Sequence, residues 1–235
     1  MPDLRILPAS HPMGYSIDWL PDGRLLTTGD KVRRQEPDGS MAVHAGQRAN
    51  EIVVDARGNA YVNGADFDFA AGAPPRPGYI KLITPDGQLR QVAGDIQFPN
   101  GMVITPDGRT LIISESFAGR LTAFDIDADG GLSGRRVWAD VGDGVPDGIS
   151  VDAENAVWYA EVPGRRCARV AEGGEELESV PLDRGGFACV LGGAEGTTLF
   201  ITAAEWRGMT DAQMVTPGSG QVVTVPVDVP AAGWP

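Results

Sequence analysis

Three oxygen-bearing side chains recur at one position of a repeated pattern: Asn50, Asn100 and Asp147. Each opens a β-rich run, at a place where a strand ordinarily prefers β-branched residues. Because Asn and Asp also start turns, one such residue could have a purely structural origin. Three at the same register favour a hard divalent cation held by carbonyl and carboxylate oxygens.

The element that must position these residues is a hairpin, which the stretch 98–115 shows most completely. The run 102–105 is rich in β-formers, Pro106-Asp107-Gly108 forms a turn, and 111–113 is a second apolar run. The same layout recurs at positions 15, 50, 100, 147 and 188, which are occupied by Tyr15, Asn50, Asn100, Asp147 and Ala188. A hairpin repeated every ~40–50 residues is typical of β-propeller blades.

The chain supplies a second hairpin in several of these units, for example at 80–92 and at 121–138. Four strands per unit is the propeller pattern, and the first strand of each unit then lines the central channel. A sandwich whose turns resemble one another by chance is the alternative, and five copies in register make it the weaker one. We predict an all-β propeller with about five blades in a single domain, 1–235.

Composition limits the function classes. A chain of 235 residues suits one all-β domain with a full core, and its net charge of −13 argues against nucleic acid and anionic membranes. Because the chain has only two histidines, His11 and His44, a catalytic triad that depends on histidine is disfavoured. Cys167 and Cys189 form no CxxC pair and are predicted to be buried free thiols. With no signal peptide or transmembrane stretch, we predict a cytoplasmic protein, monomeric or weakly homo-oligomeric.

Two further segments invite interpretation. Residues 66–78 interrupt the second unit with two aromatic residues and three prolines, and such an insertion is either a lid over a binding site or a decorated edge. We predict that it covers the channel mouth on the side of Arg48. The basic cluster Arg165, Arg166 and Arg169 is interpreted as a solvated strand edge.

At this point the chain resembles the SMP-30, gluconolactonase and luciferin-regenerating-enzyme family, which includes regucalcin. The matching motifs cover nearly the whole chain from about residue 14, and they are Arg48-Ala49-Asn50-Glu51, Phe98-Pro99-Asn100-Gly101, Leu121-Thr122-Ala123-Phe124-Asp125 and Val145-Pro146-Asp147-Gly148-Ile149. Each motif alone is weak, but together they are specific.

The resemblance implies a six-bladed propeller that hydrolyses sugar-type or related lactones with a divalent cation in its channel. It implies Asn50, Asn100 and Asp147 as metal ligands and Arg48 as the arginine that contacts the substrate, with Asn50 and Glu51 expected beside it. From the residue types, we expect Asp147 to act as the acid/base. Glu51 stands where the family usually has Asp. The cation is expected to be Ca²⁺, with Mg²⁺, Mn²⁺ or Zn²⁺ as alternatives, and the partner a small lactone.

One departure from the family affects this expectation. The family's fourth ligand is a Glu in a Glu-x-Pro-x-Trp motif, one blade before the unit of Tyr15, and this sequence lacks that motif. We therefore predict five blades, three of the four ligands, a gap beside the Tyr15 blade, and weak calcium binding. A non-catalytic propeller that binds a small molecule or metal, and a hydrolase of aryl esters or phosphotriesters, remain alternatives.

Overall fold

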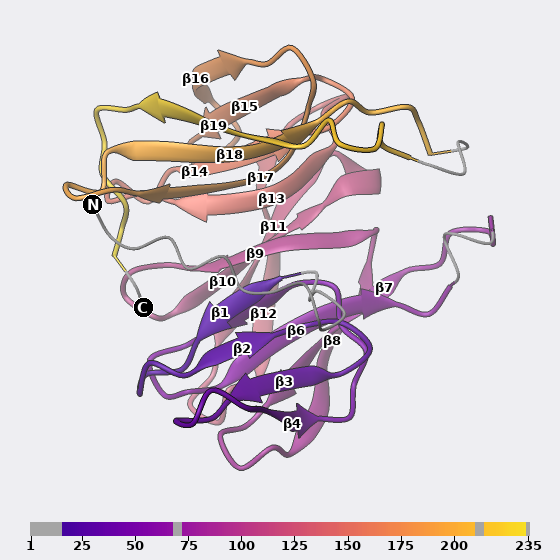
Figure 1. Cartoon of the computed structure of the whole chain (residues 1–235), viewed down its shortest axis with the longest axis vertical. Helices are drawn as coiled ribbons and strands as arrows, with labels where there is room; N and C mark the ends of the chain where they lie inside the picture. The colour runs from indigo at the N-terminus through magenta and orange to yellow at the C-terminus, as the bar shows by residue number, and fades with distance from the viewer. Residues whose placement is uncertain (1–15, 68–71, 210–213, 234–235) are drawn as a thin grey trace.

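The chain folds as a β-propeller made of antiparallel sheets, each of which is one blade (Figure 1). The computed structural model describes residues 16–67, 72–209 and 214–233. Within these ranges four sheets have four strands and one has three. The predicted all-β fold with about five blades is confirmed. Tyr15 lies outside the described residues.

Within every blade, strands that follow one another in the chain also pair with one another. The first blade comprises β1 (Ile17–Trp19), β2 (Leu25–Thr27), β3 (Val32–Gln35) and β4 (Met41–Ala45). The second comprises β5 (Ile52–Val54), β6 (Ala60–Ala65), β7 (Gly78–Ile83) and β8 (Leu89–Ile96). The third comprises β9 (Pro99–Ile104), β10 (Thr110–Glu115), β11 (Arg120–Ile126) and β12 (Leu132–Asp140), with the short 3-10 helix η1 (Ser116–Ala118) after β10.

The last two blades complete the described part of the chain. The fourth comprises β13 (Pro146–Val151), β14 (Val157–Glu161), β15 (Arg166–Val170) and β16 (Glu176–Pro181). The fifth comprises β17 (Gly185–Gly192), β18 (Thr198–Ala204) and β19 (Gln221–Pro226). The repeat copy at Ala188 therefore lies in β17, the first strand of the fifth blade.

Local side-chain chemistry sets the hairpin turns. In the turn between β9 and β10, Asp107 Oδ1 accepts hydrogen bonds from Thr105 Oγ1 at 2.6 Å and from the Arg109 backbone N–H at 3.1 Å. Gly108 follows with φ of 68°, a left-handed conformation that glycine adopts without a steric cost. The Pro-Asp-Gly signature therefore predicts these turns directly from the sequence.

The blades pack around a channel that their first strands line. The first strands of successive blades contact one another, and all five border one cavity of about 660 Å³. The hydrophobic core lies between neighbouring blades: one cluster joins Val103 and Ile112 of the third blade to Ile149 and Tyr159 of the fourth. Because each blade packs mainly on its neighbours, a propeller buries its core blade by blade.

The first and fifth blades leave apolar side chains exposed where they face each other. The third residue of each repeat, counted from the position of Asn50, is buried in the three middle blades, with exposures of 5% for Ile52, 6% for Met102 and 8% for Ile149. The equivalent Ile17 of β1 and Val190 of β17 are 53% and 57% exposed. In Figure 1 the first blade (indigo) lies below the fifth (orange to yellow), with strands β9 and β10 of the third blade visible between them. Among the described residues, Ile17 and Val190 thus lack the cover that their counterparts in the middle blades receive.

The structure corrects the interpretation of the basic cluster as a solvated edge. Arg169 is buried, and its guanidinium donates to Asp152 at 2.6 Å and to Glu154 at 2.8 Å. Arg166 pairs with Glu161 at 2.7 Å and with Glu176 at 2.7 Å. These arginines hold the fourth blade together through ion pairs, which the sequence spacing did not reveal because the partners lie on β14, on β16 and in the turn between β13 and β14.

The two cysteines are buried free thiols, as predicted. Cys189 lies in β17 and its Sγ is 3.6 Å from the Gly148 carbonyl oxygen of the fourth blade. A hydrogen bond between the two thiols, together with burial, raises the pKa of Cys167 well above its usual range. Within the described ranges, no helix is long and apolar enough to cross a membrane.

Candidate functional site

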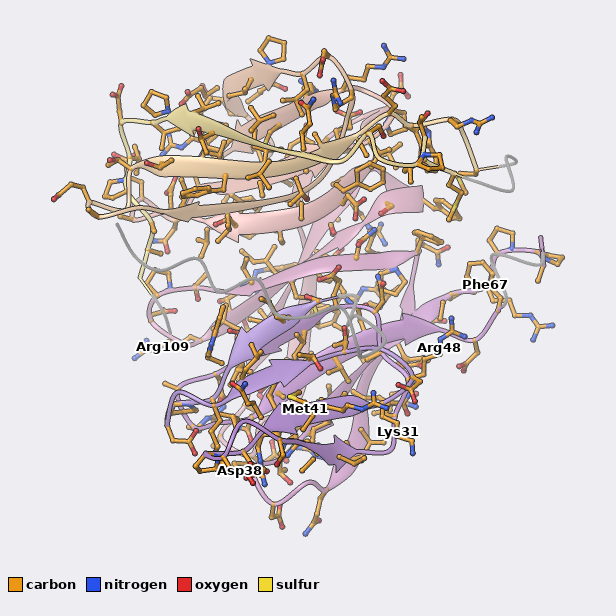
Figure 2. All side chains as sticks on the ribbon, viewed as in Figure 1. Lys31, Asp38, Met41, Arg48, Phe67 and Arg109 are labelled. Carbon is orange, nitrogen blue, oxygen red and sulfur yellow. The ribbon has the colours of Figure 1, made fainter. Side chains whose placement is uncertain are left out.

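The three residues singled out by the repeat lie at the same end of their blades. Asn100 is the second residue of β9, Asp147 is the second residue of β13, and Asn50 precedes β5 by two residues. Since these strands are the first of their blades and line one channel, their beginnings meet at one mouth. In Figure 2 this end carries the labelled Arg48, and the opposite end carries Arg109 of the Pro-Asp-Gly turn.

Glycines directly after Asn100 and Asp147 let the first strands approach closely. A Cβ atom on Gly101 would lie 2.6 Å from the Ile149 nitrogen and 2.8 Å from the Asp147 carbonyl oxygen. A Cβ atom on Gly148 would lie 2.7 Å from Ala188 Cα. Real Cβ atoms do not tolerate such distances, so the Asn-Gly and Asp-Gly pairs are what bring neighbouring blades together at the site.

Side chains of the preceding blade fix the backbone of each site residue. The Thr28 hydroxyl donates to the Asn50 carbonyl oxygen at 2.7 Å, and the Asn63 amide donates to the Asn100 carbonyl oxygen at 2.6 Å. The Ser114 hydroxyl donates in the same way to the Asp147 carbonyl oxygen at 2.6 Å. Each junction between blades 1 and 4 therefore contains one side-chain hydrogen bond that sets the position of a site residue.

Sequence reasoning missed these positioning residues, although a signal was present. Thr28 and Asn63 follow positions 15 and 50 by the same interval, and Ser114 follows Asn100 by one residue more. Short polar residues at a nearly constant distance after the repeat position are out of place in or directly after a buried second strand. Asn63 and Ser114 are fully buried, which is where an unsatisfied polar group would be costly.

Asn100 is held from two sides. Its side-chain nitrogen donates to the Ser116 hydroxyl at 3.3 Å, and Ser116 in turn donates to the Pro146 carbonyl oxygen at 2.7 Å. The residue is buried. With its amide nitrogen used in this way, the amide oxygen is the atom that Asn100 can offer to a ligand.

Two carboxyl groups from different blades share the electrostatics of the channel mouth. Burial raises the pKa of Glu51 to about 7, and a hydrogen bond with Ser16 opposes this only in part. Burial also raises the pKa of Asp147 well above its usual range, and the negative charge of Glu51 raises it further. The negative charges of these two desolvated carboxyl groups repel each other, and among the described residues no nearby positive charge offsets the rise in their pKa values.

Arg48 and the insertion lie on the same rim. Gln47 joins the backbone next to Arg48 to the end of the insertion, because its Nε2 donates to the Arg48 carbonyl oxygen at 2.6 Å and to Tyr79 Oη at 3.1 Å. At the start of the insertion, the Phe67 ring is 6.1 Å from that of Phe98, two residues before Asn100. Positions 68–71 lie outside the described residues, so the cover over the mouth stays a prediction.

The cavity extends from this mouth along the channel. Glu51, Gly101 and Gly148 line it, as do the exposed Ile17 and Val190 of the flanking blades. Its lining therefore combines one partly buried acid with apolar strand surface. A polar mouth above an apolar channel can orient a small molecule by a few polar groups.

A β-propeller whose first strands bring amide and carboxyl groups to one channel mouth is the class that this geometry defines. Residues 17–205 match the family described as SMP-30/Gluconolactonase/LRE-like region. The chain belongs to this family, which confirms the resemblance noted from its motifs.

Individual relatives agree with this placement. The 6-deoxy-6-sulfogluconolactonase of Pseudomonas putida is 27% identical over 162 residues, which is 67% of this chain and 56% of that protein. Regucalcin of Danio rerio is 32% identical over 127 residues, which is 52% of this chain and 43% of that protein. The chain thus spans about half the length of the curated relatives it matches.

Solved structures show the same fold. A gluconolactonase from Xanthomonas campestris has a TM-score of 0.67 at 28% identity, covering 80% of this chain and 68% of that one. The calcium-binding protein regucalcin from Agrobacterium tumefaciens has a TM-score of 0.75 at 22% identity, covering 92% of this chain and 76% of that one. The second likeness, at its lower identity, concerns the fold alone.

Proposed function

We propose that this protein is a cytoplasmic hydrolase that opens sugar-type or related lactones with a divalent cation at the channel mouth. The observation that carries the proposal is the pair of desolvated carboxyls, Glu51 and Asp147, which two different blades place in one electrostatic environment. Asn100, on the blade between them, offers an amide oxygen at the same mouth. The names of the relatives, gluconolactonases among them, agree with this chemistry.

The residues present fit a hard cation. Asn50, Asn100 and Asp147 are the ligands that we infer, and all three offer oxygen, as calcium and magnesium prefer. The raised pKa values of Glu51 and Asp147 indicate that their negative charge lacks compensation, which a divalent cation would supply. We infer that Glu51 provides the second carboxylate toward the cation, in addition to its expected contact with substrate.

The chain's own residues then divide the work of hydrolysis. Held by Asn50, Asn100 and Asp147, a divalent cation would supply Lewis-acid polarisation of the lactone carbonyl. The Asp147 carboxylate accepts a proton from the attacking water and returns it to the ring oxygen as the C–O bond breaks. Arg48 on the rim orients the hydroxyl groups of the substrate. Asn50 and Asn100 are neutral oxygen donors and transfer no proton.

The test is hydrolysis of δ-gluconolactone, followed with a pH indicator, for the parent and for Asp147→Asn. We expect activity with Ca²⁺, loss of activity with a chelator, and a loss of at least about a hundredfold in Asp147→Asn, since an amide accepts no proton. Asp107→Asn, a change in a solvent-exposed turn at the far end of β9, is the matched control and keeps the parent's rate. Equal rates for the parent and Asp147→Asn would contradict the assignment of the base.

A non-catalytic binding propeller is the second candidate. The exposure of Ile17 and Val190 favours it, because these two apolar residues line the cavity and the described residues leave each of them more than half exposed. Such a protein binds Ca²⁺ without turning over any lactone. Calorimetric titration of Ca²⁺ beside the hydrolysis assay separates the two functions. Diisopropyl-fluorophosphatase of Loligo vulgaris is 27% identical over 145 residues, which makes diisopropyl fluorophosphate an additional substrate to test.

A further inference from the structure

An aromatic residue close to the site holds a backbone conformation that bulky side chains rarely adopt. Phe98, two residues before Asn100, has φ of 59°. Glycine adopts this left-handed region freely, but a phenylalanine there is a genuine outlier. Strain of this kind persists only where the surroundings enforce it, and it gathers at functional sites.

The surroundings that enforce it are a buried ion network. Glu115 is fully buried, and it accepts hydrogen bonds from Thr122 at 2.5 Å, Arg120 at 3.1 Å and Arg135 at 3.1 Å. Its other oxygen accepts from the backbone N–H of Gln97 at 2.7 Å. The residue before Phe98 is thereby fixed to a charged group that the protein has neutralised with two arginines.

Two backbone hydrogen bonds extend this fixation to a second aromatic residue. The Ser116 N–H donates to the Phe98 carbonyl oxygen at 3.1 Å, and the Phe117 N–H donates to the Gln97 carbonyl oxygen at 3.2 Å. The rings of Phe98 and Phe117 stack with centroids 4.2 Å apart and planes 19° apart. Phe117 nevertheless remains 41% exposed. The strain therefore holds a flat apolar surface at the solvent boundary.

This surface adjoins the site at two points. Ser116, beside Phe117, accepts a hydrogen bond from the side chain of Asn100 and donates one to the carbonyl oxygen just before Asp147. Phe67, from the insertion that follows β6, brings a third ring 6.1 Å from that of Phe98 at 51°. Figure 2 shows Phe67 at the same end of the molecule as Arg48. We call Phe67, Phe98 and Phe117 the aromatic rim.

We propose that the aromatic rim is a specificity site that binds a flat apolar group of the substrate beside its reacting carbonyl. The ligand class is a lactone or ester with an aromatic or extended apolar substituent, in preference to a polyhydroxylated ring alone. Stacked aromatic contacts favour such groups, and sugar hydroxyls gain no hydrogen bond from a phenylalanine face. The proposal rests on the proposed lactone hydrolysis and adds the substrate class.

The experiment compares dihydrocoumarin, whose lactone is fused to a benzene ring, with δ-gluconolactone. For Phe117→Ala we expect kcat/KM for dihydrocoumarin to fall about three- to tenfold, mainly through KM, because a stacked pair contributes on this scale. We expect gluconolactone to change less than about twofold. Phe117→Tyr retains the ring and keeps the parent's preference. Phe98→Gly, which suits the positive φ, removes the second ring without adding backbone strain.

Leu177→Ala is the control, because Leu177 is 43% exposed on β16 of the fourth blade and has a similar exposure without adjoining the site. We expect Leu177→Ala to leave kcat/KM unchanged for both substrates. If Phe117→Ala lowers kcat/KM equally for both substrates, or lowers it for neither, the specificity site is refuted.

Binding of the ring-opened product, 3-(2-hydroxyphenyl)propanoate, by saturation-transfer NMR separates this proposal from the proposed function. Product binding that depends on Phe117 in a parent without lactonase activity would uphold the rim and refute the hydrolase. Lactonase activity together with product binding that does not depend on Phe117 would uphold the hydrolase and refute the aromatic rim as a binding site.

Discussion

The substitution Glu51→Gln tests whether the channel mouth stores unfavourable charge. Burial raises the pKa of Glu51 from 4.5 to about 7, so in the absence of a cation the folded state holds this proton more tightly than the unfolded state. Folding stability contributed by this group is therefore complete below pH 4.5, falls as the pH rises toward 7, and stays low above. At about 1.36 kcal/mol per pKa unit, the cost at pH 8 is about 3 kcal/mol.

The glutamine side chain of the variant carries no charge at any pH, so the variant escapes this cost. In chelator at pH 8 we expect Glu51→Gln to be more stable than the parent by up to about 3 kcal/mol, or a melting temperature about 6–12 °C higher. At pH 4.5 the two proteins should be nearly equal in stability, because this carboxyl then carries little of its cost in the folded state. The variant should also gain less from added Ca²⁺, since ligand charge contributes to calcium affinity.

Urea unfolding followed by tryptophan fluorescence measures these stabilities, with the fully buried Trp158 among the reporters. Glu178→Gln, a change of the same chemistry on the exposed strand β16, is the control and should differ from the parent by less than about 0.5 kcal/mol at both pH values. Equal stabilisation of Glu51→Gln at pH 4.5 and pH 8 would refute the electrostatic reasoning. No stabilisation at pH 8 would show that Glu51 is not desolvated.

Three further outcomes follow from the packing. Glu115→Gln removes the acid from a buried network with two arginines, so urea unfolding should show a loss of about 3–5 kcal/mol, and a loss under about 1 kcal/mol would contradict the network. Gly101→Ala forces the third and fourth blades apart and should cost about 1–3 kcal/mol, whereas Gly46→Ala, where a Cβ meets nothing within 4 Å, is the control and should be neutral. Ile17→Ser should change the unfolding free energy by less than about 0.5 kcal/mol while Ile149→Ser costs several, and equal losses would show that a partner covers Ile17 in solution.

The repeat carried most of the fold prediction, because a blade is a local structure. Hairpin turns depend on neighbouring residues, as in the hydrogen bonds of Asp107 and the positive φ of Gly108, so the sequence reveals them one unit at a time. Equal spacing of the units then indicates a propeller. The common register of Asn50, Asn100 and Asp147 likewise follows from the repeat, since equivalent positions start equivalent strands.

The environment of each side chain was decided by the tertiary structure. Ile17 and Ile149 occupy the same place in the repeat, yet one is 53% and the other 8% exposed, because Ile149 packs in the core between the third and fourth blades and the described residues give Ile17 no such cover. Arg169 looked like a surface residue until β15 placed it beside Asp152. Burial, charge coupling and ion pairing depend on residues distant in the chain, so no local pattern reports them.

The same division applies to the candidate site. By itself the sequence predicted oxygen ligands and the base Asp147 and indicated the family, because residue types and their spacing are local properties. Only the folded chain showed that Glu51 and Asp147 repel each other, that Ser114 and Asn63 hold the backbone of the site, and that a strained Phe98 stacks at its edge. These features arise where separate blades meet, and the distances there are set by packing between strands that the sequence leaves tens of residues apart.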